Sequence, residues 1–127
     1  MEKRYKVTNN DYRSILADGK YCLRYTIGSI VRSVPGTFGI MLYEHYHQAR
    51  DKLDSLKRIV KGRILEVEPI GDRFVPRKVC GNFEQSSLEK FYDERRKGRT
   101  PRQLMSAPTG TVCYSSVKVL RDITHLY

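Results

Sequence analysis

The chain has 127 residues, of which 39% are hydrophobic and 30% charged, and its 24 Lys and Arg against 14 Asp and Glu give a formal net charge of +10. This length fits one domain, and the spread of apolar residues along the whole chain argues against a disordered tail. The positive charge excludes an acidic solvating protein and favours an anionic partner.

The sequence carries no targeting or membrane signal that we recognise. No apolar run follows the N-terminal residues 1–4, and no stretch approaches the roughly 18 apolar residues of a membrane-spanning helix. The three cysteines, Cys22, Cys80 and Cys113, are odd in number and far apart, which argues against a disulfide framework. We therefore expect a soluble, intracellular protein from a reducing compartment, with no membrane partner.

The first part of the chain is rich in strand signals. Large and polar side chains alternate over residues 4–8, which predicts a half-buried strand. Aromatic and β-branched residues favour a second strand at residues 20–27, and residues 30–34 are a third strand or its continuation. Proline and glycine mark residues 35–39 as a loop, and residues 40–43 follow as a short buried strand.

The middle of the chain changes its period. Apolar residues recur at steps of three and four and predict a helix over residues 44–58. Residues 62–70 return to the alternation of a strand, with the two glutamates of that segment on one face. Residues 73–81 are extended, and Pro76 within them indicates an edge strand.

The last part of the chain predicts a second helix and a final strand. Ser86 and Glu89 have the spacing of a capping box, ahead of a helix that runs to about residue 97. Residues 99–110 are predicted as a loop, and residues 111–123 as a strand or hairpin. The element order predicts a single α+β domain over residues 1–127, with two helices and a curved, mainly antiparallel sheet.

Part of the chain, residues 35–80, resembles a known group of proteins. Residues 39–44 (Gly-Ile-Met-Leu-Tyr-Glu), a helix containing Ala49, and residues 62–72 (Gly-Arg-Ile-Leu-Glu-Val-Glu-Pro-Ile-Gly-Asp) are similar to small uncharacterised domains of phages and large DNA viruses. The resemblance implies a viral or phage-derived protein, located in the host cytoplasm or in the virion.

That group resembles, more remotely, the layout of ADP-ribosyltransferases. One class of these enzymes uses an arginine on an early strand, a Ser-Thr-Ser strand and a Glu-x-Glu pair. The resemblance implies that Arg24 takes the first role and Glu66 with Glu68 the last, while no segment matches Ser-Thr-Ser. It implies, as an alternative function, a small enzyme that uses NAD.

Glu66 and Glu68 are also the best acid pair on chemical grounds. Positions i and i+2 of a strand face the same side, about 7 Å apart, which suits general acid and base catalysis. A solvated sheet face has the same pattern, and we favour that explanation.

Other catalytic or metal-binding arrangements have weaker support. A zinc site from Cys22, Cys80, Cys113 and one histidine lacks the close cysteine pair of structural zinc sites. Cys80 or Cys113 with an imidazole would make a hydrolase, but both also suit small buried positions. His45 and His47 diverge on a helix and share a face only on a strand. We expect no metal and no cofactor.

The strongest functional signal is basic. The first basic group follows the second helix and comprises Arg95, Arg96, Lys97, Arg99 and Arg102. The helix dipole explains two of these cations but hardly five, and the planar fork of arginine suits phosphate or carboxylate. The second basic group follows the first helix and comprises Lys57, Arg58, Lys61 and Arg63. If both groups lie on one face, nine positive charges converge there.

These features favour a non-enzymatic binding or assembly protein. We expect its arginine-rich face to dock on an acidic macromolecule, either a nucleic acid or a protein such as a capsid component. No small-molecule ligand is expected from the sequence.

Overall fold

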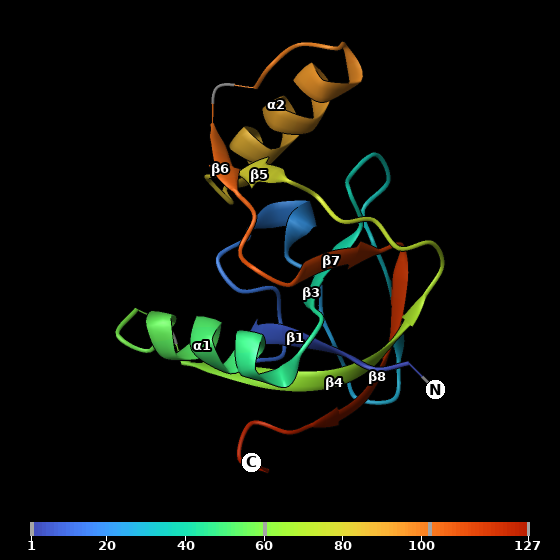
Figure 1. Ribbon diagram of the computed structural model, residues 1–127, viewed down its shortest axis with the longest axis vertical. Coiled ribbons are helices and arrows are strands. Elements are labelled where there is room, and N and C mark those ends of the chain that lie inside the picture. Colours follow the sequence, from blue (N-terminus) through green and yellow to red (C-terminus); the bar gives the residue numbers. More distant parts are fainter. Residues whose placement is uncertain (1, 60, 102, 127) are drawn as a thin grey trace.

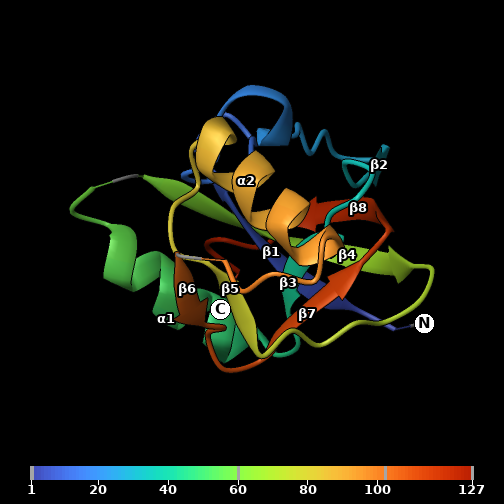
Figure 2. The same ribbon diagram turned by 90° about the horizontal axis from the view of Figure 1, so that it is seen from above.

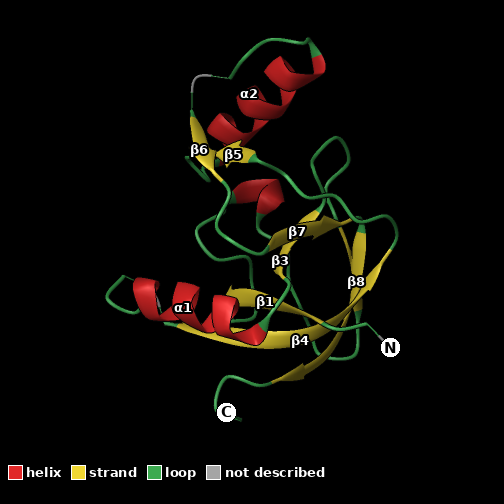
Figure 3. Cartoon of the chain, in the orientation of Figure 1, coloured by secondary structure: helices red, strands yellow, loops and turns green. Residues whose placement is uncertain are grey.

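The computed structural model describes residues 2–59, 61–101 and 103–126. In this part of the chain it has two α-helices, a six-stranded antiparallel sheet with the order β2-β8-β4-β1-β3-β7, and a second sheet made of β5 and β6. The α+β class predicted from the sequence is confirmed (Figure 3). Neither sheet is strongly curled, so the expected curvature stays a prediction.

The elements follow one another along the chain as strands, helix, strands, helix, strands. The larger sheet consists of β1 (Arg4–Asn9), β2 (Ile30–Arg32), β3 (Ile40–Tyr43), β4 (Gly62–Ile70), β7 (Thr111–Tyr114) and β8 (Ser116–Asp122). The smaller sheet pairs β5 (Lys78–Cys80) with β6 (Leu104–Ser106), and the helices are η1 (Gly19–Tyr21), α1 (Tyr46–Leu56) and α2 (Gln85–Arg96).

Helix α1 covers one face of the larger sheet, as its periodicity predicts. Ala49 and Leu53 are buried against Val7 of β1 and Ile64 of β4. At the start of the helix, the His45 N–H donates to Gln48 Oε1 over 3.0 Å, which satisfies one of the free donors at that end. The helix predicted over residues 44–58 is confirmed, and in the structure it spans Tyr46–Leu56.

The opposite face of the sheet is covered as well. Leu42, Leu65 and Val67 lie there, and Tyr25, only 1% exposed, packs onto them. The strand predicted at residues 20–27 is wrong, because this segment forms the end of η1 and a single bridge, and it packs Tyr25 on the sheet face instead of pairing with the sheet. The strand predicted at residues 4–8 is confirmed as β1, and most of its residues are half-buried. Helix α1 packs on one of its faces, and Tyr25 lies over Lys6 on the other.

Helix α2 and the smaller sheet form a second layer above the larger sheet (Figure 1). Cys80, Leu88, Phe91 and Tyr92 are its buried cluster. The predicted capping box is wrong, because α2 begins one residue before Ser86 and its first N–H donates to the Asp18 carboxylate of another segment. Strand β6 lies within residues 99–110, which were predicted as a loop. A strand of three residues is too short to show the alternation from which strands are predicted.

The C-terminal strand signal is divided between two strands. Ser115 alone separates β7 from β8, yet β7 pairs with β3 while β8 pairs with β2 and β4. The segment is therefore two strands with separate partners and not a hairpin.

Asp122 closes β8 in a polar cluster. Its carboxylate accepts hydrogen bonds from the Tyr12 hydroxyl over 2.9 Å and from the Thr124 N–H over 2.9 Å, and Arg63 Nη1 lies 3.3 Å away. Burial alone would raise the pKa of Asp122, but these hydrogen bonds and the Arg63 charge hold it below its ordinary value of 3.8.

This depressed pKa predicts how stability depends on acid. The stability that Asp122 contributes is fully present above about pH 4, its unfolded pKa, and is lost as the pH falls through the lower folded value. We expect Asp122→Asn to lower the free energy of unfolding by about 1 kcal/mol at neutral pH, allowing for solvent screening. The difference from wild type should shrink toward pH 2 in urea unfolding series. Asp72→Asn, at an exposed position, is the control, and an Asp122 effect that does not change with pH would contradict the prediction.

Candidate binding surface and cavity

The first basic group lies at the exposed C-terminal end of α2. The Arg95 guanidinium sits over the Phe38 ring, 4.8 Å from its centroid, and Arg96 Nη1 donates to the Gly36 carbonyl over 3.5 Å. Both contacts join the end of α2 to the loop at residues 35–39. Arg102 lies outside the described residues.

Carboxylates compensate this charge only in part. Asp93 pairs with Lys97 over 3.0 Å and with Arg96 over 3.7 Å, and the hydrogen bond from Lys97 lowers the pKa of Asp93. Arg95, Arg96, Lys97 and Arg99 are all exposed, and against them stand Asp93 and Glu94, so four cations less two carboxylates leave a local charge of +2.

Aromatic rings adjoin these arginines. Phe38 contacts Phe74, with ring centroids 5.1 Å apart, and Phe74 remains 42% exposed. We call Arg95, Arg96, Phe38 and Phe74 the arginine–aromatic surface. Sequence reasoning missed both phenylalanines, because they belong to segments that only the fold brings to α2.

The second basic group lies elsewhere on the molecule. Lys57, Arg58 and Lys61 are exposed around the C-terminal end of α1, which lies far from that of α2 in both views (Figures 1 and 2). Arg63 points into the Asp122 cluster and also donates from Nε to Asn10 Oδ1 over 2.9 Å. The two groups therefore do not converge on one face.

Glu66 is a structural residue in this fold. It is 4% exposed and pairs with Lys3 Nζ over 3.4 Å and with Arg121 Nε over 3.2 Å, so the solvated sheet face favoured from the sequence is wrong for it. These pairs tie the segment before β1 and strand β8 to β4. Glu68 is half-buried and lies opposite Lys118. Arg24 is exposed, and its backbone forms an isolated antiparallel β-bridge with Arg13.

Two of the three cysteines are buried, and two of the three histidines stack on each other. Burial raises the pKa of Cys113 to about 12, which keeps its thiol protonated at neutral pH. Cys80 is 2% exposed, and its thiol donates to the Asn82 carbonyl over 3.0 Å. The His45 and His47 rings stack 5.7 Å apart because His45 precedes the helix. Within residues 2–59, 61–101 and 103–126, no three potential ligands gather as a metal site would need.

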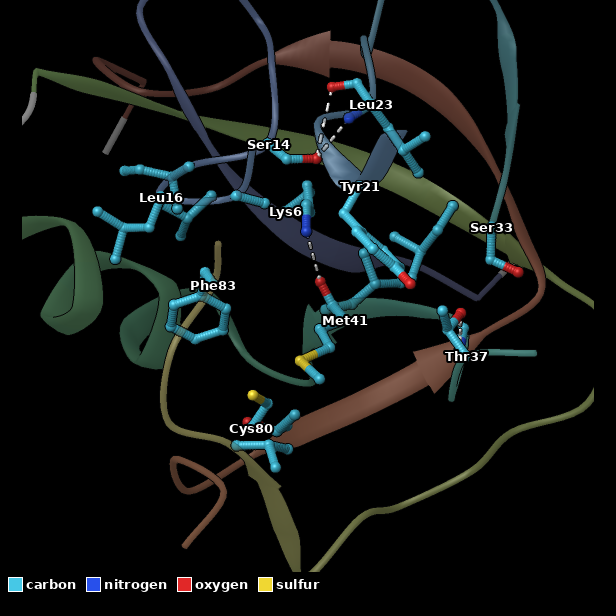
Figure 4. A pocket seen from close by; sticks show the side chains of 18 of the residues that line it. Lys6, Ser14, Leu16, Tyr21, Leu23, Ser33, Thr37, Met41, Cys80 and Phe83 are labelled. Atoms are coloured by element: carbon cyan, nitrogen blue, oxygen red, sulfur yellow. Dashed lines mark hydrogen bonds between the residues drawn. The ribbon is translucent and has the colours of Figure 1, made fainter. Parts of the chain in front are cut away.

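A cavity of about 170 Å³ lies between the larger sheet and the second layer (Figure 4). Most of its walls are apolar, and Lys6 points into it from β1. A second pocket, of about 370 Å³, lies beside α2 and includes Lys90 and Glu94 in its lining. The lining of neither pocket includes Glu66, Glu68 or Arg24.

Comparison with known protein families, with curated proteins and with solved structures finds no match for this chain. The resemblance to phage and viral domains, and with it a viral origin, therefore stays a prediction. Neither described helix has the combination of length and apolar composition that crossing a bilayer requires.

Proposed function

We propose that this chain is a non-enzymatic binding protein whose arginine–aromatic surface docks on nucleic acid with unpaired bases. The observation that carries the proposal is the position of Arg95 over Phe38, 4.8 Å from the ring centroid, beside a Phe74 that is 42% exposed. Unpaired nucleic acid offers both phosphates, which bind arginine, and base faces, which stack on aromatic rings.

The geometry favours this partner over a purely acidic protein. An acidic protein surface would use the cations but would leave an exposed aromatic ring such as Phe74 without a stacking partner. The contact with the Phe38 ring holds the Arg95 guanidinium at this surface, where its N–H groups can donate to a phosphate. The net charge of +10 adds long-range attraction to a polyanion.

A salt titration of binding to a fluorescent thymidine 20-mer tests the proposal. The logarithm of the association constant should fall linearly with the logarithm of salt concentration, by about 0.7 for each phosphate contacted, or about 2 for three contacts. Binding that does not change with salt, or no binding at low salt, would contradict it. Binding to polyglutamate as tight as to the oligonucleotide would favour an acidic protein instead.

Variants with equal charge changes locate the surface. Arg95→Gln should weaken oligonucleotide binding about tenfold, since a charge-assisted contact contributes about 1.5 kcal/mol. Arg58→Gln, which removes one charge from the second basic group, should change it less than about threefold. Phe74→Ala should cost about 1–3 kcal/mol of binding free energy through lost stacking. Equal effects of Arg95→Gln and Arg58→Gln would show that only net charge matters.

A further inference from the structure

Lys6 occupies an unusual position for a lysine. It lies opposite Leu65 of β4, and the Tyr5–Tyr43 pair places it beside Leu42 of β3. Leu65 is 0% and Leu42 1% exposed, and both belong to the apolar cluster of that sheet face. The central strand therefore presents a cation on the side where its neighbours present core residues.

The contacts of Lys6 do not neutralise its charge. Nζ donates one hydrogen bond to the Met41 carbonyl over 3.1 Å and lies 5.2 Å from the Tyr25 ring centroid. Among the described residues, Lys6 makes no ion pair. Lys6 is half-buried. An ammonium that lies partly against apolar side chains without a carboxylate is less favourable there than a hydrophobic residue of similar volume.

The cavity into which Lys6 points has the same charge bias. Lys6 and Lys52 line it, and none of its described lining residues is Asp or Glu. Figure 4 shows apolar side chains from both layers around Lys6, among them Leu16, Leu23 and Phe83.

Two hydroxyl side chains of the cavity are already engaged with the backbone. The Ser14 hydroxyl accepts from the Leu23 N–H over 2.9 Å, and the Thr37 hydroxyl donates to the Val34 carbonyl over 2.8 Å. An ammonium has three N–H donors, and Lys6 uses one of them in its hydrogen bond to the Met41 carbonyl. Lys6 therefore keeps two donors for a ligand at an apolar site.

We infer that this cavity binds a small monocarboxylate with a compact apolar body, whose carboxylate rests on Lys6 Nζ. One ammonium among apolar walls matches a single negative charge, whereas a phosphate dianion would need more donors. An apolar cavity of about 150 Å³ is known to accommodate benzene, so one of 170 Å³ suits benzoate or a short-chain carboxylate. This site is separate from the arginine–aromatic surface and does not depend on the proposed function.

Thermal unfolding and isothermal titration with benzoate test the inference. We expect saturable benzoate binding that raises the melting temperature of the wild type. Benzamide, a neutral analogue of the same shape, should bind about tenfold more weakly, the ratio that corresponds to a charge-assisted contact. No benzoate binding at 10 mM, a concentration about ten times the expected millimolar dissociation constant, would overturn the inference. Equal binding of the two compounds would overturn it as well.

A variant of Lys6 separates its ligand role from a structural one. Lys6→Met keeps the side-chain length and removes the charge, so it should abolish the preference for benzoate over benzamide without lowering the melting temperature of the free protein. Lys52→Gln, at the other cation of the lining, is the control and should retain the preference. Benzoate selectivity that survives in Lys6→Met would overturn the inference.

A measurement on the wild type covers the case in which Lys6→Met fails to fold. Both Met41 and Met105 line the cavity. Benzoate should shift their methyl signals in ¹³C-methyl NMR spectra. Benzoate shifts that spare both Met41 and Met105 would overturn the inference.

Discussion

Gly39→Ala is expected to lower the free energy of unfolding by about 3 kcal/mol or more, through backbone strain together with a steric clash. Gly39 precedes β3 with a φ of +110°, a conformation that alanine adopts only with strain. A Cβ at this position would lie 2.7 Å from the Tyr114 carbonyl oxygen and 2.9 Å from the Tyr114 carbonyl carbon. These atoms belong to β7, whose residue Tyr114 pairs with Ile40, so relief of the clash would distort the β3–β7 pairing.

Gly28→Ala is the matched control for this prediction. Gly28 has a φ of +89°, but a Cβ there would meet nothing within 4 Å. It should therefore show the dihedral strain alone, about 1 kcal/mol. Urea unfolding followed by far-ultraviolet circular dichroism measures both free energies. Equal losses in the two variants would mean that the close approach of β7 to Gly39 has no energetic importance.

Local patterns in the sequence predict the elements that depend on local rules. The apolar period of three and four found α1 because Ala49 and Leu53 bury one helix face against β1 and β4. The strand prediction for residues 20–27 was wrong because strand propensity reflects how well a residue suits a half-buried sheet surface. It does not determine whether the backbone pairs with another strand. Tyr25 is as buried as a strand residue would be, but its side chain packs on the face of the larger sheet and its backbone is not part of that sheet.

The candidate functional residues could not be predicted fully from the sequence, because they are defined by contacts between segments far apart in the chain. The composition of the segment around Arg95 identified it as basic, yet its contact with Phe38 exists only because the loop before β3 reaches α2. Likewise, the alternation over residues 4–8 predicted a half-buried strand but could not show what lies over the face that carries Lys6. The fold covers that face, and this covering turns a routine surface lysine into a cation beside an apolar cavity.

The cavity also depends on how firmly the second layer is held. Leu88 and Tyr92 of α2 line it from one side, and Leu42 of β3 lines it from the other. Any change that loosens α2 should therefore widen the cavity. Phe38 joins α2 to the larger sheet. It lies in the loop before β3, and its ring contacts Phe91 and Tyr92 of α2, with centroids 5.9 Å and 5.1 Å away.

Phe91→Ala is accordingly expected to cost about 3–5 kcal/mol of stability, the range for removing a buried phenylalanine. Phe91 is 2% exposed and packs edge-on against Phe38 and Tyr92. Helix α2 has no other buried side chain of phenylalanine's size except Tyr92, so the second layer would lose one of its two large anchors. Urea unfolding followed by far-ultraviolet circular dichroism and by tyrosine fluorescence measures the loss.

Phe74→Ala is the comparison, because Phe74 also contacts Phe38 but is 42% exposed, and it should cost about 1 kcal/mol. The two optical probes should give one shared transition in the wild type. In Phe91→Ala an early transition seen by only one probe would show that the second layer unfolds first. A loss below that of Phe74→Ala would mean that this cluster does not hold α2 in place.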